Sequence, residues 1–126
     1  MNEKTILLIG TYDTKDPEMR FLEGCIREQG AKVLTMDVSV LGDPTEPTDI
    51  SKHDVATAAG MSIDEVIALG DENKAFRVMS RGAASVVAKA HGDGRIDAML
   101  ATGGTMGTDL ALDCACLLYT SDAADE

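Results

Sequence analysis

The clearest structural signal in this chain lies in Thr5-Ile6-Leu7-Leu8-Ile9-Gly10-Thr11-Tyr12-Asp13-Thr14-Lys15. Its first five residues form a continuous apolar run that stops at a glycine, which is typical of a parallel β-strand covered on both faces. The polar turn after the glycine leads to Asp16 and Pro17, an N-cap residue followed by a proline suited to the first position of a helix. A buried strand that runs through a short turn into a helix predicts an α/β fold.

The rest of the chain continues to alternate between strand and helix patterns. Two Ser-x-x-acid pairs, Ser51 with Asp54 and Ser62 with Glu65, predict two short helices that end near glycines. The hydrophobic patterns predict a helix over residues 17–29, a strand over 32–38, a loop over 39–51, a helix over 72–90 and a strand over 96–101. The predicted fold is α/β, a three-layer sandwich with a parallel sheet that is incomplete at the carboxyl end.

Charge and composition restrict the classes of function. The formal charge of −11, from 22 acidic and 11 basic residues, disfavours binding to nucleic acids and to anionic membranes. No apolar run is long enough to span a membrane, and the 3 cysteines lack the spacing of metal or disulfide motifs. We therefore expect a cytoplasmic protein without nucleic-acid or membrane partners, and association into a homo-oligomer stays open.

Two turns at strand ends hold the candidate ligand-binding residues. In a parallel sheet, the carboxyl ends of neighbouring strands open into a crevice toward which the following helices point their positive N-terminal ends. Glycines there leave room for a phosphate, threonine hydroxyls can donate hydrogen bonds, and a lysine adds positive charge. The two turns supply Gly10, Thr11, Asp13, Thr14, Lys15, Gly103, Gly104, Thr105, Gly107 and Thr108. The same residues would also build ordinary strand-to-helix turns, since neither turn matches a Walker A loop or a dinucleotide-binding fingerprint.

Several residues near these turns have more than one role open to each. Asp13 can bind Mg²⁺ through water, accept a proton, or cap the next helical turn. Asp37, at the end of the second strand, can accept hydrogen bonds from ribose hydroxyls or cap the following loop, and Ser39 can assist either role. Arg77 and Arg81 lie one helical turn apart and can contact phosphate or pair with nearby acids. No set of nucleophile, base and orienting residue can be assembled from the local sequence.

With these motifs located, the chain resembles the amino-terminal domain of the tomato mosaic virus resistance protein family, the Tm-one-like ATP-binding proteins. The resemblance covers about residues 4–114. It rests on five blocks in the same order, which are residues 10–15 with Glu18, residues 37–42, residues 54–56 with Ala59 and Gly60, Met79 with Gly82, and residues 103–108. The family usually has a small residue where Met106 stands in the last block.

The resemblance implies an ATP site in a Rossmann-like amino-terminal domain, with ATP bound alone or together with Mg²⁺. The two Gly/Thr turns would hold the phosphates, and Asp37 and Ser39 would form a further side of the site. Residues 1–115 would then be a partial amino-terminal nucleotide-binding domain, and a second α/β domain of the same protein would be missing. Residues 116–126 look like a non-native tail, because they resemble the ending that results when a sequencing adaptor is translated.

These features leave three functions open. The leading one is ATP binding by the amino-terminal domain of a larger two-domain protein, in which the bound nucleotide stabilises or regulates the whole. The second is an enzyme that acts on ATP or a phosphorylated metabolite at the cleft with the missing domain, as in bacterial relatives joined to a lyase-like or hydrolase-like barrel. The third is a protein-interaction or inhibitory module, as in a plant relative that binds a viral replication protein.

Overall fold

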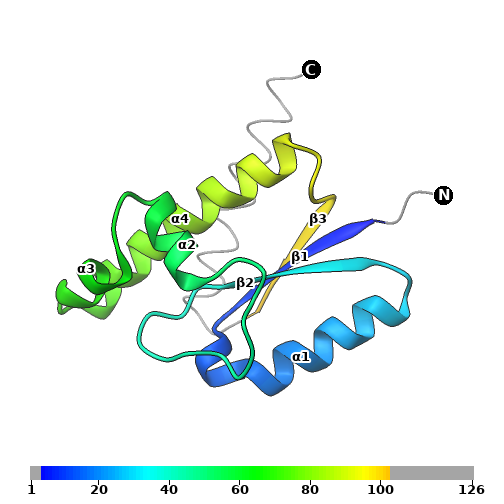
Figure 1. The fold of residues 1–126 in the computed structure, drawn as a ribbon, viewed down its shortest axis with the longest axis horizontal. Coiled ribbons are helices and arrows are strands. Elements are labelled where there is room, and N and C mark those ends of the chain that lie inside the picture. Colours follow the sequence, from blue (N-terminus) through cyan, green and yellow to red (C-terminus); the bar gives the residue numbers. More distant parts are fainter. Residues whose placement is uncertain (1–3, 103–126) are drawn as a thin grey trace.

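The computed structural model describes residues 4–102 of the chain. Within them the chain forms β1 (Thr5–Gly10), α1 (Tyr12–Glu28), β2 (Lys32–Asp37), α2 (Lys52–Ala58), α3 (Ile63–Ala68), α4 (Glu72–Gly92) and β3 (Ala98–Ala101). The three strands form one parallel sheet in the order β2-β1-β3 (Figure 1). The predicted α/β fold with a parallel sheet is confirmed. The second Gly-rich turn and the predicted tail fall within residues 103–126, which lie outside the described residues.

Helices cover both faces of the sheet because side chains alternate in direction along the central strand, β1. On one face, Leu8 forms a buried cluster with Val33 of β2 and with Tyr12 and Met19 of α1. On the other face, Leu7 belongs to a larger cluster to which α2, α3 and α4 contribute most of the apolar side chains. Figure 1 shows α1 on one side of the sheet and α2 and α4 on the other. Helix, sheet and helix are thus the three layers of the predicted sandwich.

The two crossovers of the chain run over opposite faces of this sheet. Helix α1 connects β1 to β2 on one side, and α2, α3 and α4 connect β2 to β3 on the other. From β1 the chain continues to β2 on one side of it, whereas the next strand, β3, lies on the other side of β1. The order in which the strands are added across the sheet therefore reverses between β1 and β3. Such a reversal leaves a crevice at the carboxyl ends of the two strands, and open α/β sheets bind their ligands there.

The helix α1 begins earlier than the sequence predicts. It starts at Tyr12 rather than at Pro17, and at Lys15 the backbone leaves helical geometry (φ −116°, ψ 19°) and forms a kink. The physical reason is Pro17, which has no N–H to donate back into the preceding turn and restricts the backbone before it. The residues from Tyr12 to the kink form a first helical turn, and Pro17 lies inside α1 just after the kink. The carboxylate of Asp16, predicted as the cap, accepts a hydrogen bond from Arg20 Nε at 3.4 Å.

Both predicted capping boxes are present, and they start the two short helices. Ser51 and Ser62 accept hydrogen bonds from the N–H groups of Asp54 and Glu65, whose carboxylates accept from the serine N–H groups in return. Each box pairs two donors that a helix end would otherwise leave without partners. The start of α2 is thereby placed directly after the loop that follows β2.

The helix α4 is amphipathic and carries much of the larger core. Its buried residues include Met79, Ala83 and Val87, which lie on one face as the sequence predicts. Gly82 lies on the same buried side and contacts α2. Within residues 4–102, neither α4 nor any other helix combines the length and the apolar character needed to cross a membrane.

Candidate functional site

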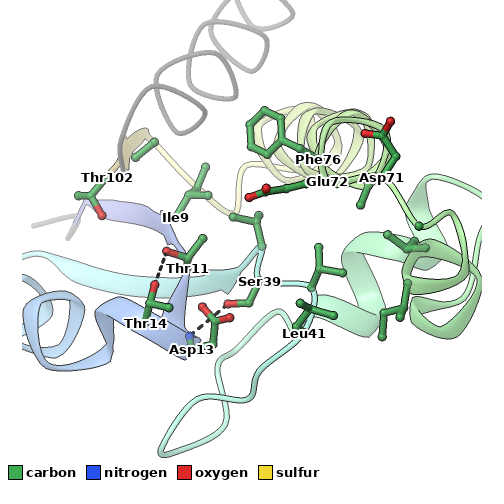
Figure 2. A pocket seen from close by; sticks show the side chains of 17 residues that line it. Ile9, Thr11, Asp13, Thr14, Ser39, Leu41, Asp71, Glu72, Phe76 and Thr102 are labelled. Atoms are coloured by element: carbon green, nitrogen blue, oxygen red, sulfur yellow. Dashed lines mark hydrogen bonds between the residues drawn. The ribbon is translucent and has the colours of Figure 1, made fainter.

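A pocket of about 630 Å³ opens at the carboxyl ends of β1 and β3. Ile9 and Thr11 border it at the end of β1, and Ala101 and Thr102 border it at the end of β3. The loop after β2, helix α3 and the start of α4 complete its walls (Figure 2). The pocket lies where the chain reverses across the sheet, and its volume is in the range of small-molecule sites.

One wall of the pocket is polar and comes from the first turn of α1. The hydroxyl oxygens of Thr11 and Thr14 lie 3.3 Å apart. Asp13 lies beside the loop after β2, and its backbone N–H donates to Ser39 Oγ at 3.2 Å (Figure 2). The structure thus brings four predicted site residues together at the pocket, namely Thr11, Asp13, Thr14 and Ser39.

The backbone donors of this turn are already used within the protein. The N–H groups of residues 12 and 13 donate to side chains at the end of β2 and just after it, Asp37 Oδ1 at 3.3 Å and Ser39 Oγ at 3.2 Å. Those of residues 14 and 15 both donate to the carbonyl oxygen of Thr11, at 3.3 and 2.9 Å. A phosphate bound to the N–H groups of this helix end would have to displace these contacts. The turn therefore offers a ligand its threonine hydroxyls and the Asp13 carboxylate.

Asp37 joins the start of α1 to the loop after β2. Its Oδ1 accepts hydrogen bonds from the N–H of Tyr12 and from both the N–H (2.9 Å) and the hydroxyl of Ser39. The residue is 1% exposed and does not border the pocket. Of the two roles that the sequence left open for Asp37, these contacts match the loop cap.

Two further predicted residues, Gly10 and Lys15, do not border the pocket. A Cβ at Gly10 would lie 2.6 Å from the sulfur of buried Met19, so a larger residue there would displace the end of that side chain, which packs against the strand end. The side chain of Lys15 is exposed at the kink in α1. The remaining predicted residues lie outside the described residues, and they are Gly103, Gly104, Thr105, Gly107 and Thr108.

The opposite wall of the pocket is apolar with acidic residues at its edge. Phe76 and Val66 belong to the apolar part, while Asp71 and Glu72 stand at the N-terminal end of α4. Figure 2 shows the Glu72 side chain extending from the start of α4 into the space beside the Phe76 ring. Together with Asp13, 3 carboxylates and no Lys, Arg or His border the pocket among the residues that the structure describes. This lining favours positive charge in a ligand or in an ion bound with it.

A complete metal site is not formed by the described part of the protein alone. Within residues 4–102, no group of 3 or more His, Cys, Asp or Glu side chains is arranged to hold a metal ion. The Asp71 carboxylate is partly used as the N-cap of α4, where Oδ1 accepts from the N–H groups of Asn73 (2.8 Å) and Lys74 (3.1 Å). Asp13 and Glu72 are thus the carboxylates with most freedom to contact a ligand.

Sequence reasoning missed the wall formed by α3 and α4. Phe76 matches the apolar stripe of α4, and that stripe reads as core from the sequence. Lys52 was missed as well: it is 7% exposed and holds the loop after β2 through backbone carbonyl groups, which no side-chain motif reveals. Arg77 and Arg81, for which a phosphate contact was open, are exposed and do not border the pocket.

Comparison with known proteins places this chain among bacterial relatives. Residues 4–118 match the model of the Uncharacterised protein family (UPF0261) N-terminal domain. A UPF0261 protein of Brucella suis biovar 1 is 44% identical over 117 residues, which are 93% of this chain and 28% of that protein. A UPF0261 protein of Clostridium tetani is 34% identical over 111 residues, 88% of this chain and 27% of that protein. The chain, which spans less than a third of the length of these curated relatives, belongs to the UPF0261 family and corresponds to its N-terminal domain.

Proposed function

We propose that this chain binds ATP in the pocket at the carboxyl ends of β1 and β3, as the amino-terminal nucleotide-binding domain of a larger protein. The observation that carries the proposal is the place of the pocket, at the point where the chain reverses across a parallel sheet. The resemblance to Tm-one-like ATP-binding proteins supports ATP as the nucleotide in this proposal. In the larger protein, bound ATP would stabilise or regulate the other domain.

The two walls of the pocket suit the two ends of a nucleotide. The apolar wall with Phe76, Val66 and Leu41 suits a purine ring, which gains from burial against aliphatic and aromatic surface. The polar wall offers the hydroxyls of Thr11 and Thr14 as donors. The second Gly/Thr turn follows directly after Thr102 in the chain, and we assign the phosphates to that turn together with these hydroxyls.

The negative lining makes Mg²⁺ part of this proposal. Asp13, Asp71 and Glu72 would repel the phosphates of free ATP, and a divalent ion offsets that repulsion. Mg²⁺ bound with a nucleotide usually takes one or two carboxylates beside phosphate oxygens and water. Asp13 is the residue on the polar wall that can supply such a carboxylate.

Calorimetric titration of the full-length protein tests this function. We expect ATP to bind in the presence of Mg²⁺ and to bind much more weakly in EDTA, while adenosine binds equally with and without the metal. Asp13→Asn should weaken Mg·ATP binding about tenfold, since one charge-assisted contact is lost while the shape of the side chain is kept. The matched control is Asp93→Asn, an equal change of charge on an exposed residue at the far end of α4.

Three results would count against the proposal. Absence of binding by ATP, ADP and adenosine would reject a nucleotide site. Equal affinity for ATP with Mg²⁺ and with EDTA would reject the role of the metal. Equal weakening by Asp13→Asn and Asp93→Asn would mean that overall charge, and not the polar wall of the pocket, controls binding.

A further inference from the structure

Lys52 is a buried lysine at a position that is unfavourable for a cation. It is 7% exposed, and it is the first residue of α2, where the positive end of the helix dipole lies. Burial of an ammonium group also costs free energy unless oxygen atoms replace its water. The contacts of Lys52 must therefore offset two penalties.

These contacts all come from one short segment of the loop after β2. Lys52 Nζ donates to the carbonyl oxygens of Gly42 (2.9 Å) and Val40 (3.4 Å) and pairs with Asp43 Oδ1 at 2.9 Å. The hydrogen bond from Lys52 lowers the pKa of the Asp43 carboxyl below its ordinary value. Because the Asp43 side chain is 81% exposed, water screens that pair, and the two carbonyl groups are the stronger anchors.

The same segment forms part of the pocket wall. Val40 and Leu41 border the pocket, although Leu41 is 79% exposed. On its other side the segment packs against the polar wall, since a Cβ at Gly42 would lie 2.7 Å from Asp13 Cβ. The segment is thus held between Lys52 and Asp13. Leu41, which Figure 2 shows at the pocket, remains free to be covered when a ligand enters.

We propose that Lys52 is a positioning residue for the ligand: it holds residues 40–42 against Asp13, so that the part of the pocket wall formed by Val40 and Leu41 is in place before the ligand arrives. Lys52 itself does not border the pocket, so it acts through the loop and not by contact with the ligand. This inference rests on the proposed nucleotide site for the identity of the ligand. A wall that is already in place spares the ligand the entropic cost of ordering it.

The test compares Lys52→Met with Lys89→Met in the full-length protein. Both variants lose one positive charge, but Lys89 is exposed in the last turn of α4. The first measurement is the rate at which thermolysin cleaves before Leu41, which reports how far residues 40–42 leave the protein surface. The second is the affinity for adenosine, whose binding involves the apolar wall without the phosphates.

We expect Lys52→Met to be cleaved before Leu41 several times faster than wild type and to bind adenosine about tenfold more weakly. Lys89→Met should match wild type in both measurements. Asp43→Asn should have a cleavage rate and an adenosine affinity close to those of wild type, because the hydrogen bonds from Lys52 to the carbonyl groups of Val40 and Gly42 remain. Lys52→Gln, which keeps a donor but loses reach and charge, replaces Lys52→Met if that variant does not fold, with the same expected direction.

Each outcome decides a separate claim. Equal cleavage of Lys52→Met and Lys89→Met would overturn the anchoring of the segment by Lys52. Faster cleavage with unchanged adenosine affinity would overturn its role in ligand binding. If wild type binds neither adenosine nor ATP, the proposed function fails, and the proposal that Lys52 positions the segment for a nucleotide is rejected with it. The cleavage rates still establish in that case whether Lys52 anchors the loop.

Discussion

Single residues at the end of β2 set the position of the first turn of α1. Asp37 accepts hydrogen bonds from the N–H of Tyr12 and from Ser39, and Ser39 Oγ accepts in turn from the N–H of Asp13. This chain of contacts places the Asp13 carboxylate at the pocket while it uses the helix donors that a phosphate would otherwise meet. One buried aspartate thereby influences which chemical groups the pocket offers.

A prediction at this scale concerns Tyr12, the first residue of α1, which is fully buried. Among the described residues its hydroxyl has no hydrogen-bond partner, while the Arg20 guanidinium lies 5.0 Å from the ring centroid. Tyr12→Phe keeps the ring and removes the unsatisfied hydroxyl, so the free energy of unfolding should rise by about 1 kcal/mol. Urea unfolding followed by far-UV circular dichroism measures this change, and a fall of similar size would mean that the hydroxyl is bonded.

The same residue predicts a dependence on alkaline pH. Burial raises the pKa of the Tyr12 hydroxyl above its ordinary value of 10.0. In the unfolded chain the hydroxyl therefore loses its proton first, so its titration leaves the free energy of unfolding unchanged below pH 10.0 and lowers it as the pH rises above that value. Tyr12→Phe should lose less stability than wild type between neutral pH and pH 11, measured by urea titration at each pH.

At the scale of elements, the contact between α2 and α4 depends on the absence of a side chain. A Cβ at Gly82 would overlap the carbonyl oxygen of Val55, a backbone atom that cannot turn aside. The two helices therefore approach each other more closely than any larger residue at position 82 would allow. The contact lies within the larger core, and the same helix carries at its start the acidic residues that border the pocket.

Gly82→Ala should accordingly destabilise the protein by about 3 kcal/mol, the upper part of the range for overpacked cores. The matched control is Gly24→Ala in α1, where a Cβ would meet nothing within 4 Å. Because alanine is the better helix former, that control should gain roughly 0.5–1 kcal/mol. Chemical unfolding of both variants checks the pair, and equal effects would show that helix propensity rather than contact with α2 governs position 82.

At the scale of the whole molecule, β1 joins two cores of unequal size. Within residues 4–102, the cluster on the α1 face has 4 buried residues, whereas the cluster on the α4 face has 16. Leu7 and Leu8, both fully buried, are neighbours in β1 that point to opposite faces. Since β1 hydrogen-bonds to both other strands, neither core can open fully while the other stays intact.

We therefore expect Leu7→Ala and Leu8→Ala each to lower the free energy of unfolding by about 2–5 kcal/mol and each to retain a single unfolding transition. Hydrogen exchange followed by mass spectrometry should show α1 and α4 losing protection at the same denaturant concentration in both variants. Loss of protection in α1 alone in Leu8→Ala would mean that the two faces unfold independently. The control is Ile67→Ala in α3, where the residue is 42% exposed. It should lower the free energy of unfolding much less.

The amino-acid sequence by itself determined the strands, their parallel arrangement, the two capping boxes and the amphipathic stripe of α4. Each of these features is set by residues that lie within a few positions of one another, because apolar periodicity and helix caps act over one or two turns. The sequence also predicted a crevice at the strand ends where the pocket lies, since the carboxyl ends of parallel strands meet at one edge of a sheet. The start of α1 was predicted too late because a proline marked the second part of a kinked helix.

Only the tertiary structure decided which groups the pocket presents. The N–H groups that open α1 find their acceptors 25 and 26 residues away, and Gly10 meets Met19 rather than a ligand. The acidic and apolar wall from α3 and α4, and the anchoring of residues 40–42 by Lys52, likewise depend on segments that meet only when the helices pack on the sheet. Hydrogen bonds and contacts of this kind join distant residues through packing, and no local pattern in the chain specifies them.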